Sequence, residues 1–533
     1  MTAEEALKQL EPEKWAETPA HVRLHLLEEV RSNLREHAVE LARTDRNMKN
    51  RLMGEDIFGI PESMISTAVP IANTLTACIH LYESILKGKM PEPANITQVK
   101  EGIYDIEVVP LDAKDKMLSG TQKFHLRVKG KSKQVNPMDK PAGVIAVSGA
   151  GNYSSSLEMV KAMFLENCAV IHKPHKLNEE TDKIWEKIFQ PLIEVKVIAF
   201  CSADQGRALS KLEGLSKIYF TGSTGVAKAI SDAASVPLIS ECGGNNPLIV
   251  VPGEREWTQK EMVHQANQII TAAKLNGGAV CGRPQTVVTS KLWPQRRVFL
   301  DALKKAIVED TPAAGTYYPG SEDVKKSFID NHPNAVKFSP EKGRYTSGEF
   351  LFIENVDEDS FAVKNEAFCQ IMNEVALDVP ANAADFLPAA TDFCNSKLHG
   401  TLGCMIIIDE KTQKTYKEAL DTAVSELSYG GIAVNTIPPM IFLSPLLTWG
   451  GNEEGKEFVS GIGNFGNIYN FENIEKSILY DNFMSMGHMM RINQKAFDHL
   501  AVHMTDFAIN PTWMNFTRLM GGAVIDGFRD KDF

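Results

Sequence analysis

The first ninety residues carry apolar side chains at every third or fourth position, with charged residues between them. One such series is Leu24, Leu27, Val30 and Leu34. This period places the apolar side chains on one face of a helix, so we predict amphipathic helices from residue 1 to about residue 90. Pro91 and Pro93 end this helical region.

Short β-rich segments follow between residues 104 and 128, namely IYDIEVVPL and KFHLRVKG. Their alternation of apolar and polar residues predicts a hairpin or a small sheet beside the main body. From Gly143 the pattern changes again, because short apolar runs now alternate with helical stretches. The runs are VIAVSG, AVIHKP, KVIAFC, KIYFTGS and PLIS. Buried strands separated by helices predict a parallel sheet, which binds ligands beyond the carboxyl ends of its strands.

A second alternating series runs from Pro247 to about Asn435 and includes NPLIVV, QTVVTS, CMIIIDE and GIAVN. We therefore predict an α/β protein of three parts. Residues 1–245 would form the N-terminal helices and a dinucleotide-binding domain that residues 440–471 complete. Residues 246–439 would form a second α/β domain, and residues 472–533, rich in Met and aromatic residues, a C-terminal helical extension.

Composition narrows the class of protein. A length of 533 residues predicts two or three domains, and a net charge of −12 argues against nucleic-acid binding. The N-terminus lacks the apolar stretch of a signal peptide, and no run of about eighteen apolar residues predicts a membrane span. Eight scattered cysteines without metal-ligand spacing predict reduced thiols in a cytoplasmic protein and no metal site: Cys78, Cys168, Cys201, Cys242, Cys281, Cys369, Cys394 and Cys404.

Two glycine-rich stretches carry candidate chemistry. LISECGGNNP contains Glu241 before two glycines, and NGGAVCGRP contains Cys281 among three. Glycines let backbone N–H groups approach a ligand closely, so the pair suggests a general base and a nucleophile. Each residue alone has a plainer interpretation, because most cysteines are inert buried thiols and most glutamates are solvated charges.

The stretch KIYFTGSTGVAKAI reads as a strand, a turn of small residues and a helix. Gly222, Ser223 and Gly225 would let a phosphate approach the N–H groups at the helix start, although the spacing is not GxGxxG. Lys173, at the end of another strand, could reach the same crevice. A simple turn and a solvated lysine are the alternatives.

Together these segments resemble the aldehyde dehydrogenase superfamily, in order, over roughly residues 140–470. Matching motif residues are Asn152, Lys161, Lys173 with Pro174, Phe220 to Ser223, Glu241 with Gly243, Gly244 and Pro247, Cys281 with Asn276 and Gly278, Glu366 with Phe368, and Gly431 with Asn435. The resemblance implies a Rossmann-like nucleotide-binding domain beside an α/β catalytic domain. It also implies an NAD- or NADP-dependent oxidation of a small-molecule aldehyde in a homodimer or homotetramer.

The resemblance implies a role for each motif residue. The Cys281 thiolate would add to the aldehyde, and Glu241 would activate the water that hydrolyses the resulting thioester. The Asn152 amide and the Cys281 N–H would form an oxyanion hole, with Lys161 near its supporting network. Glu366 and Phe368 would hold the nicotinamide ribose and ring.

Several positions depart from the family pattern and indicate a divergent branch. Ala279 replaces a glutamine, Asn245 a lysine, and Cys369 with Gln370 a glycine–proline pair. Lys176, preceded by His175, stands where a glutamate often selects NAD. A cation there would attract the 2′-phosphate, so we predict that NADP is tolerated or preferred, unless Lys176 faces away into solvent.

Three alternatives remain at this stage. A CoA-acylating dehydrogenase or acyl-CoA reductase would pass the acyl group to a thiol, although such relatives generally lack the glutamate that is Glu241 here. A catalytically silent member would keep the fold for binding or assembly. In the tail, an apolar face could bind a membrane surface, although packing on the body is favoured: Met484, Met486, Met489, Met490, Phe497 and Leu500.

Overall fold

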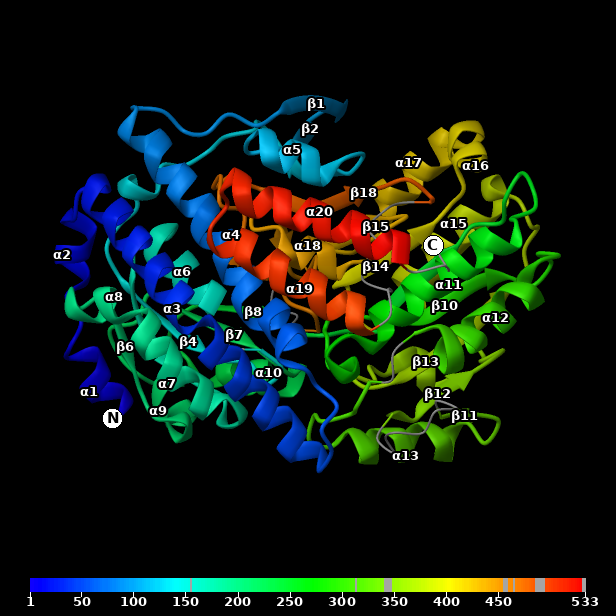
Figure 1. The fold of residues 1–533 in the computed structure, drawn as a ribbon, viewed down its shortest axis with the longest axis horizontal. Helices are drawn as coiled ribbons and strands as arrows, with labels where there is room; N and C mark the ends of the chain where they lie inside the picture. The colour runs from blue at the N-terminus through cyan, green and yellow to red at the C-terminus, as the bar shows by residue number, and fades with distance from the viewer. Residues whose placement is uncertain are drawn as a thin grey trace.

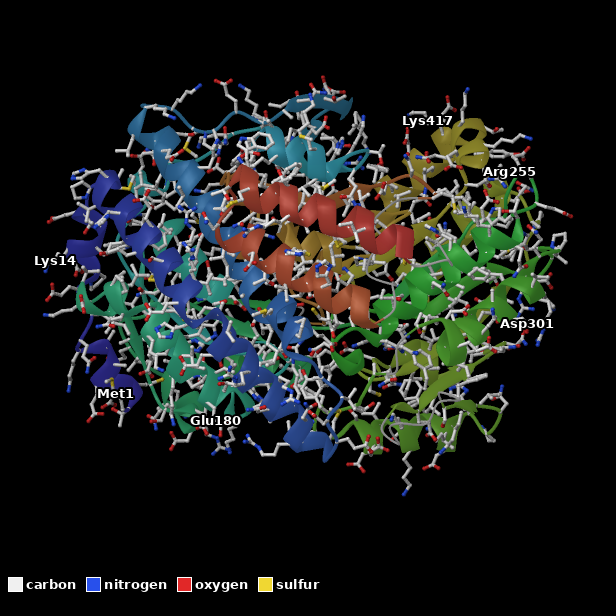
Figure 2. The ribbon with its side chains drawn as sticks, viewed as in Figure 1. Met1, Lys14, Glu180, Arg255, Asp301 and Lys417 are labelled. Carbon is white, nitrogen blue, oxygen red and sulfur yellow. The ribbon has the colours of Figure 1, made fainter. Side chains whose placement is uncertain are left out.

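The computed structural model describes residues 1–153, 156–311, 314–339, 348–453, 459–463, 465–484 and 494–529. Two sheets lie side by side in it, the smaller on the left of Figure 1 and the larger on the right. Charged side chains such as Lys14, Glu180, Asp301 and Lys417 lie at the rim of the molecule (Figure 2). The mixed α/β class predicted from the sequence is confirmed.

The smaller sheet is parallel throughout, as the strand–helix alternation predicted. Its strands, in spatial order, are β6 (Ile198–Phe200), β5 (Ala169–Lys173), β4 (Val144–Ser148), β7 (Lys217–Thr221) and β8 (Leu238–Glu241). Strands β4 and β5 are apolar and buried because helices cover both faces of the sheet. Helices of this region are α1 (Ala3–Leu7), α2 (Pro12–Glu17), α6 (Ser156–Phe164), α7 (Glu179–Ile188), α8 (Gln190–Glu194), α9 (Gly206–Ser210) and α10 (Thr224–Ala233).

The larger sheet has eleven strands in the described residues. In spatial order they are β1 (Asn95–Lys100), β2 (Ile103–Glu107), β3 (Lys123–Lys129), β18 (Ile474–Tyr480), β15 (Gly431–Val434), β14 (Gly403–Ile407), β9 (Asn246–Val250), β10 (Pro284–Ser290), β13 (Ile371–Leu377), β12 (Phe350–Ile353) and β11 (Val336–Phe338). The predicted hairpin forms from β2 and β3, but β3 also pairs with β18 and so extends the main sheet. A short second pairing joins β16 (Thr448–Trp449) to β17 (Phe465–Gly466).

The predicted helical extension from residue 472 is wrong in its first part. IEKSILY forms β18, whose central residues are buried between β3 and β15. The helices of the tail are α19 (Gln494–Ile509) and α20 (Trp513–Arg529). A segment that completes a sheet between two distant strands takes strand structure even where the flanking sequence favours helix. The other predicted domain boundaries stay predictions.

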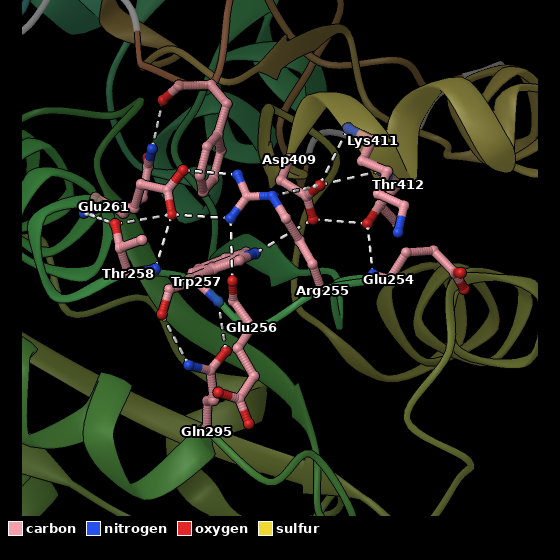
Figure 3. A network of polar contacts seen from close by, with 12 residues as sticks. Glu254, Arg255, Glu256, Trp257, Thr258, Glu261, Gln295, Asp409, Lys411 and Thr412 are labelled. Atoms are coloured by element: carbon pink, nitrogen blue, oxygen red, sulfur yellow. Dashed lines mark hydrogen bonds and ion pairs between the residues drawn. The ribbon is translucent and has the colours of Figure 1, made fainter.

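Helices of the larger sheet pack on both of its faces. They are α11 (Gln259–Lys274), α12 (Arg296–Lys305), α13 (Ser321–Asn331), α14 (Phe361–Lys364), α15 (Ala383–Lys397), α16 (Glu410–Thr415), α17 (Lys417–Glu426) and α18 (Pro439–Leu443), with α5 (Ala113–Ser119) near β1 and β2. A polar network fastens α11 and α16 to the end of β9 (Figure 3). Trp257 Nε1 donates to Asp409 Oδ2 over 3.3 Å, and Arg255 pairs with Glu261 at 2.6 Å. The network therefore fixes the carboxyl end of β9, which is the end opposite Asn246.

Two long N-terminal helices, α3 (Ala20–Met53) and α4 (Ile60–Leu86), cross the molecule, and α19 packs on α4. By length and composition α4 could span a bilayer, but 61% of its apolar window is buried inside the protein. Leu500 of α19 is also buried. Of the proposed membrane-binding face, Leu500 packs against Leu519 of α20, whereas Met486, Met489, Met490 and the side chain of Phe497 lie outside the described residues.

Candidate functional site

Glu241 is the last residue of β8, where the chain leaves the smaller sheet for the larger one. Its side chain is 1% exposed. Burial raises the pKa of Glu241 to about 8, and the negative charges of Glu158 and Glu366 act in the same direction. A carboxyl with such a pKa holds its proton at neutral pH and becomes a base in mildly alkaline solution.

Cys281 follows a tight loop that only small residues can form. Asn276, Gly277 and Gly278 all have positive φ, of 50°, 66° and 81°. A Cβ on Gly277 would lie 2.0 Å from the Gly315 carbonyl oxygen, and one on Gly278 would lie 2.7 Å from the Cys369 carbonyl carbon. The glycines therefore let this loop pass directly against two neighbouring segments. Of the eight cysteines, Cys281 is the one that is not fully buried.

The structure brings Cys281 and Glu241 together. Burial raises the pKa of the Cys281 thiol well above its usual range, and the neighbouring charge of Glu241 raises it further. The indole of Trp449 opposes this effect by favouring the thiolate. The resting site therefore holds a protonated thiol beside a protonated carboxyl group, which can accept the thiol's proton once it ionises in mildly alkaline solution.

Asn152 lies beside the cysteine loop. Its side-chain Nδ2 donates to the Ala279 carbonyl over 3.1 Å, two residues before Cys281. The side chain of Asn276 in turn donates to the Asn152 carbonyl over 3.1 Å and lies 3.0 Å from the Tyr317 hydroxyl. These contacts hold an amide donor beside the cysteine loop, where an oxyanion hole requires one.

Sequence reasoning missed two residues of this site. The indole of Trp449 is buried against Gly282, where an added Cβ would lie 2.6 Å from the ring. Asn246 donates to the carbonyls of Cys281 and Arg283 over 2.6 and 2.8 Å, and so orients the cysteine's backbone. Trp449 could have been found from the sequence, because it precedes two glycines in TWGG. No local sequence pattern indicates the role of Asn246.

Glu366 and Phe368 also reach the site. The carboxylate of Glu366 lies where Gly243 has no side chain, since a Cβ there would be 1.9 Å from Glu366 Oε1. Burial raises the pKa of Glu366 to about 7, whereas the Gly244 N–H and the Arg283 guanidinium favour its charged form. Phe368 has a positive φ of 48° and packs edge-on against Tyr318 at 5.0 Å between ring centroids.

The predicted phosphate end lies at the start of α10. The Ser223 side chain precedes the helix and makes no capping hydrogen bond, so it leaves the N–H groups of Thr224 and Gly225 for another acceptor, whereas the Val226 N–H donates to the Ser223 carbonyl over 3.1 Å. A Cβ on Gly225 would meet no atom within 4 Å, and the backbone is therefore open there. Lys173 is buried with its amine on the Pro174 carbonyl at 3.0 Å, and Lys176 is exposed.

Lys161 lies on α6 and borders a cavity. It lines a cavity of about 360 Å³ together with Gly451, Glu453 and Ile462. Burial lowers the pKa of Lys161 to about 8, while the charge of Glu166 opposes this. The recorded interactions of Lys161 do not include Asn152, so its support of the oxyanion hole stays a prediction. Among the described residues no group of three metal-ligating side chains occurs.

Comparisons with known proteins agree with this fold. Residues 82–314 match the sequence model of the aldehyde dehydrogenase family. The N-succinylglutamate 5-semialdehyde dehydrogenase of Chromobacterium violaceum is 38% identical over 122 residues, which are 21% of this chain and 25% of that protein. A probable coniferyl aldehyde dehydrogenase of Caulobacter vibrioides is 26% identical over 231 residues, 41% and 44% of the two chains. These matches span less than half of either relative's length.

Among solved structures, the γ-glutamyl-γ-aminobutyraldehyde dehydrogenase of Burkholderia cenocepacia is similar with a TM-score of 0.60 and 17% identity. The similarity covers 88% of this chain and 86% of that one, and it shows a shared fold. The chain is therefore similar to aldehyde dehydrogenases in sequence over residues 82–314 and in fold over most of its length.

Proposed function

We propose that this protein oxidises an aldehyde to a carboxylic acid with NAD or NADP. The observation that carries the proposal is the meeting of three side chains from distant segments. Cys281, the one cysteine that is not fully buried, lies against the buried carboxyl of Glu241, and the Asn152 amide is held beside the same loop.

In the first half-reaction, Glu241 accepts the proton of Cys281 and the sulfur adds to the aldehyde carbonyl. The Asn152 amide and the Cys281 N–H are the donors that we assign to the oxygen, which becomes negative in this step. Donors held in place before the reaction stabilise that charge without reorganising, and losing one typically costs about 100- to 1,000-fold in rate. Bound NAD(P) supplies the acceptor for the hydride, and the product of this half-reaction is a thioester on Cys281.

In the second half-reaction, Glu241 removes a proton from water as the water attacks the thioester. Its raised pKa fits this role, because the carboxylate is a stronger base than an exposed glutamate. This residue also argues against a CoA-acylating enzyme, which needs no activated water. Gly243 supports the arrangement indirectly, since its missing side chain leaves room for Glu366 beside the nicotinamide end.

The residues at the start of α10 fit the cofactor's pyrophosphate. The first two N–H groups of the helix are uncapped, the backbone at Gly225 is open, and the helix dipole favours an anion. Glu366 and Phe368 would hold the nicotinamide ribose and ring at the other end. We also place Lys173 beside the pyrophosphate, because it is the last residue of β5. In this structure its amine donates a hydrogen bond to the Pro174 carbonyl.

The direct test is a panel of aldehydes assayed with NAD and with NADP, without CoA. We expect reduced cofactor and free carboxylic acid in equal amounts. Product formation that requires CoA would instead support the acylating alternative. No reduced cofactor with any aldehyde, together with no cofactor binding in calorimetry, would support a silent member of the family.

The cofactor preference is tested by Lys176→Glu. Lys176 is exposed beside the strand end that carries Lys173, so its cation is free to attract a 2′-phosphate. We expect the variant to lose NADP preference, with the ratio of kcat/KM for NADP to that for NAD falling about tenfold or more, as for one charge-assisted contact. An unchanged ratio would mean that Lys176 faces away from the ribose. Lys183→Glu, seven residues further along the chain in α7, is the matched charge reversal.

We also propose that the protein is a cytoplasmic homodimer or homotetramer. Strand β1 supports an assembly, because all six of its residues are exposed at the edge of the eleven-stranded sheet. Exposed edges of this kind pair readily with another strand.

A further inference from the structure

A second carboxyl group, that of Glu158, is buried near Glu241. Glu158 lies in the first turn of α6 and is 1% exposed. The Tyr153 hydroxyl donates to its Oε1, and the Thr221 hydroxyl donates to the same oxygen over 3.0 Å. Its other oxygen, Oε2, has no hydrogen-bond partner within the described part of the chain.

The strand register places Glu158 next to Glu241. Thr221 and Glu241 are paired residues of the parallel strands β7 and β8, so their side chains point to the same face of the sheet. The Gly222 N–H also donates to the Glu241 carbonyl over 3.1 Å. Because the Thr221 hydroxyl reaches Glu158, both carboxyl groups occupy one buried region at the carboxyl end of the smaller sheet.

The two carboxyl groups have unequal surroundings. Glu158 accepts two hydroxyl hydrogen bonds on one oxygen, whereas Glu241 Oε1 has no hydrogen-bond partner among the described residues. Cys281 and Trp449 favour the charged form of Glu241, but burial outweighs them and raises its pKa. Two adjacent buried carboxylates repel each other, so one of them keeps a proton. Hydrogen-bond donors stabilise a charged carboxylate, and the charge therefore belongs on Glu158 and the proton on Glu241.

The other titratable groups facing Glu158 do not reverse this assignment. His172 of β5 is committed to Asp182, at 3.2 Å. Tyr219 of β7 lies close enough for Glu158 to affect its electrostatics, and so do Tyr153 and Lys161. Lys161 lines the neighbouring cavity and forms no recorded ion pair with Glu158. Cys281 and Glu366 both interact with Glu241 and add no positive charge.

We propose that Glu158 is a positioning residue that decides where the proton of the site resides: in the resting protein Glu158 carries the charge and Glu241 carries the proton. This rests on the proposed role of Glu241 as the deacylation base. The consequence is that Glu241 becomes a base only in alkaline solution, and that Glu158 controls the pH at which turnover begins.

The test is the pH profile of kcat in Glu158→Gln. Glutamine keeps the shape and an acceptor for both hydroxyl groups but carries no charge, so Glu241 ionises more easily. We expect the acid limb to move to lower pH by about one unit, the usual effect of a neighbouring like charge. Tyr153→Phe should also move the acid limb to lower pH, because Glu158 loses a hydrogen-bond donor and then holds a proton more readily. Combining Tyr153→Phe with Glu158→Gln should move the acid limb no further than Glu158→Gln alone. Glu166→Gln is the control, because it removes one negative charge just beyond the end of α6. We expect this variant to leave the acid limb at its wild-type pH.

A second measurement does not need activity. Difference infrared spectroscopy at neutral pH should show that the protonated-carboxyl band of the wild type loses the contribution of one group in Glu241→Gln and weakens in Glu158→Gln, while the contribution of Glu366 remains. An unmoved acid limb in Glu158→Gln, or a carboxyl band of unchanged intensity in Glu241→Gln, would overturn the inference. If no aldehyde is oxidised but the infrared band changes as expected, the proposed function is wrong and the assignment of the proton to Glu241 is confirmed.

Discussion

Replacing Cys281 with serine is expected to abolish aldehyde oxidation, with kcat falling by about 10⁴-fold or more, as when other enzymes lose their nucleophile. Serine fits the same space, so the loop of Asn276, Gly277 and Gly278 should keep its conformation. A hydroxyl is far harder to deprotonate than a thiol, and Glu241 is too weak a base to ionise it. The measurement is the formation of NADH or NADPH together with the melting temperature of the variant.

Cys242→Ser is the matched control, because Cys242 adjoins Glu241 in sequence but is buried in a cluster with Phe220 and Ala227. We expect that variant to keep most of its activity. Alkylation with iodoacetamide provides a second readout, and the fastest-modified peptide should be the one containing Cys281, since the other cysteines are buried. Faster modification of another cysteine, or an active Cys281→Ser, would contradict the assignment of the nucleophile.

Glu241→Gln is expected to slow turnover by about 100- to 10,000-fold, the typical contribution of a general base. If deacylation is the step that suffers most, the variant should release about one equivalent of reduced cofactor per subunit in a rapid burst before turnover stalls. Hydroxylamine should restore turnover, because it attacks the thioester without a base. Stopped-flow measurement of the burst and intact-mass detection of the acyl enzyme would check both points.

The pH dependence follows from the raised pKa of Glu241, about 8. The base is the ionised form, so wild-type deacylation should fall about tenfold per pH unit below pH 8 and level off above it. Glu366→Gln removes another buried carboxyl from the same region and should instead raise the KM for the cofactor.

Absence of a burst in Glu241→Gln would assign Glu241 to the first half-reaction rather than to hydrolysis.

The three main site residues could be predicted because each stands in a recognisable local motif. Glu241 precedes two glycines at a strand end, Cys281 follows a glycine-rich loop, and Asn152 follows the first strand of a parallel sheet. Such motifs depend on backbone geometry over a few residues, which the local sequence specifies. The role of Lys161 stays a prediction, because its motif position does not specify which groups surround its amine in the folded protein.

By itself, the sequence determined the α/β class, the parallel smaller sheet and the glycine loops that expose Cys281, because these follow from periodicity and from residues that permit positive φ. Only the tertiary structure decided that residues 474–480 form a strand, that Trp449 and Asn246 contact the cysteine loop, and that Glu158 lies beside Glu241. The physical reason is sequence distance. A side chain's burial and charge environment depend on segments hundreds of residues away, and no local pattern encodes which of them will meet.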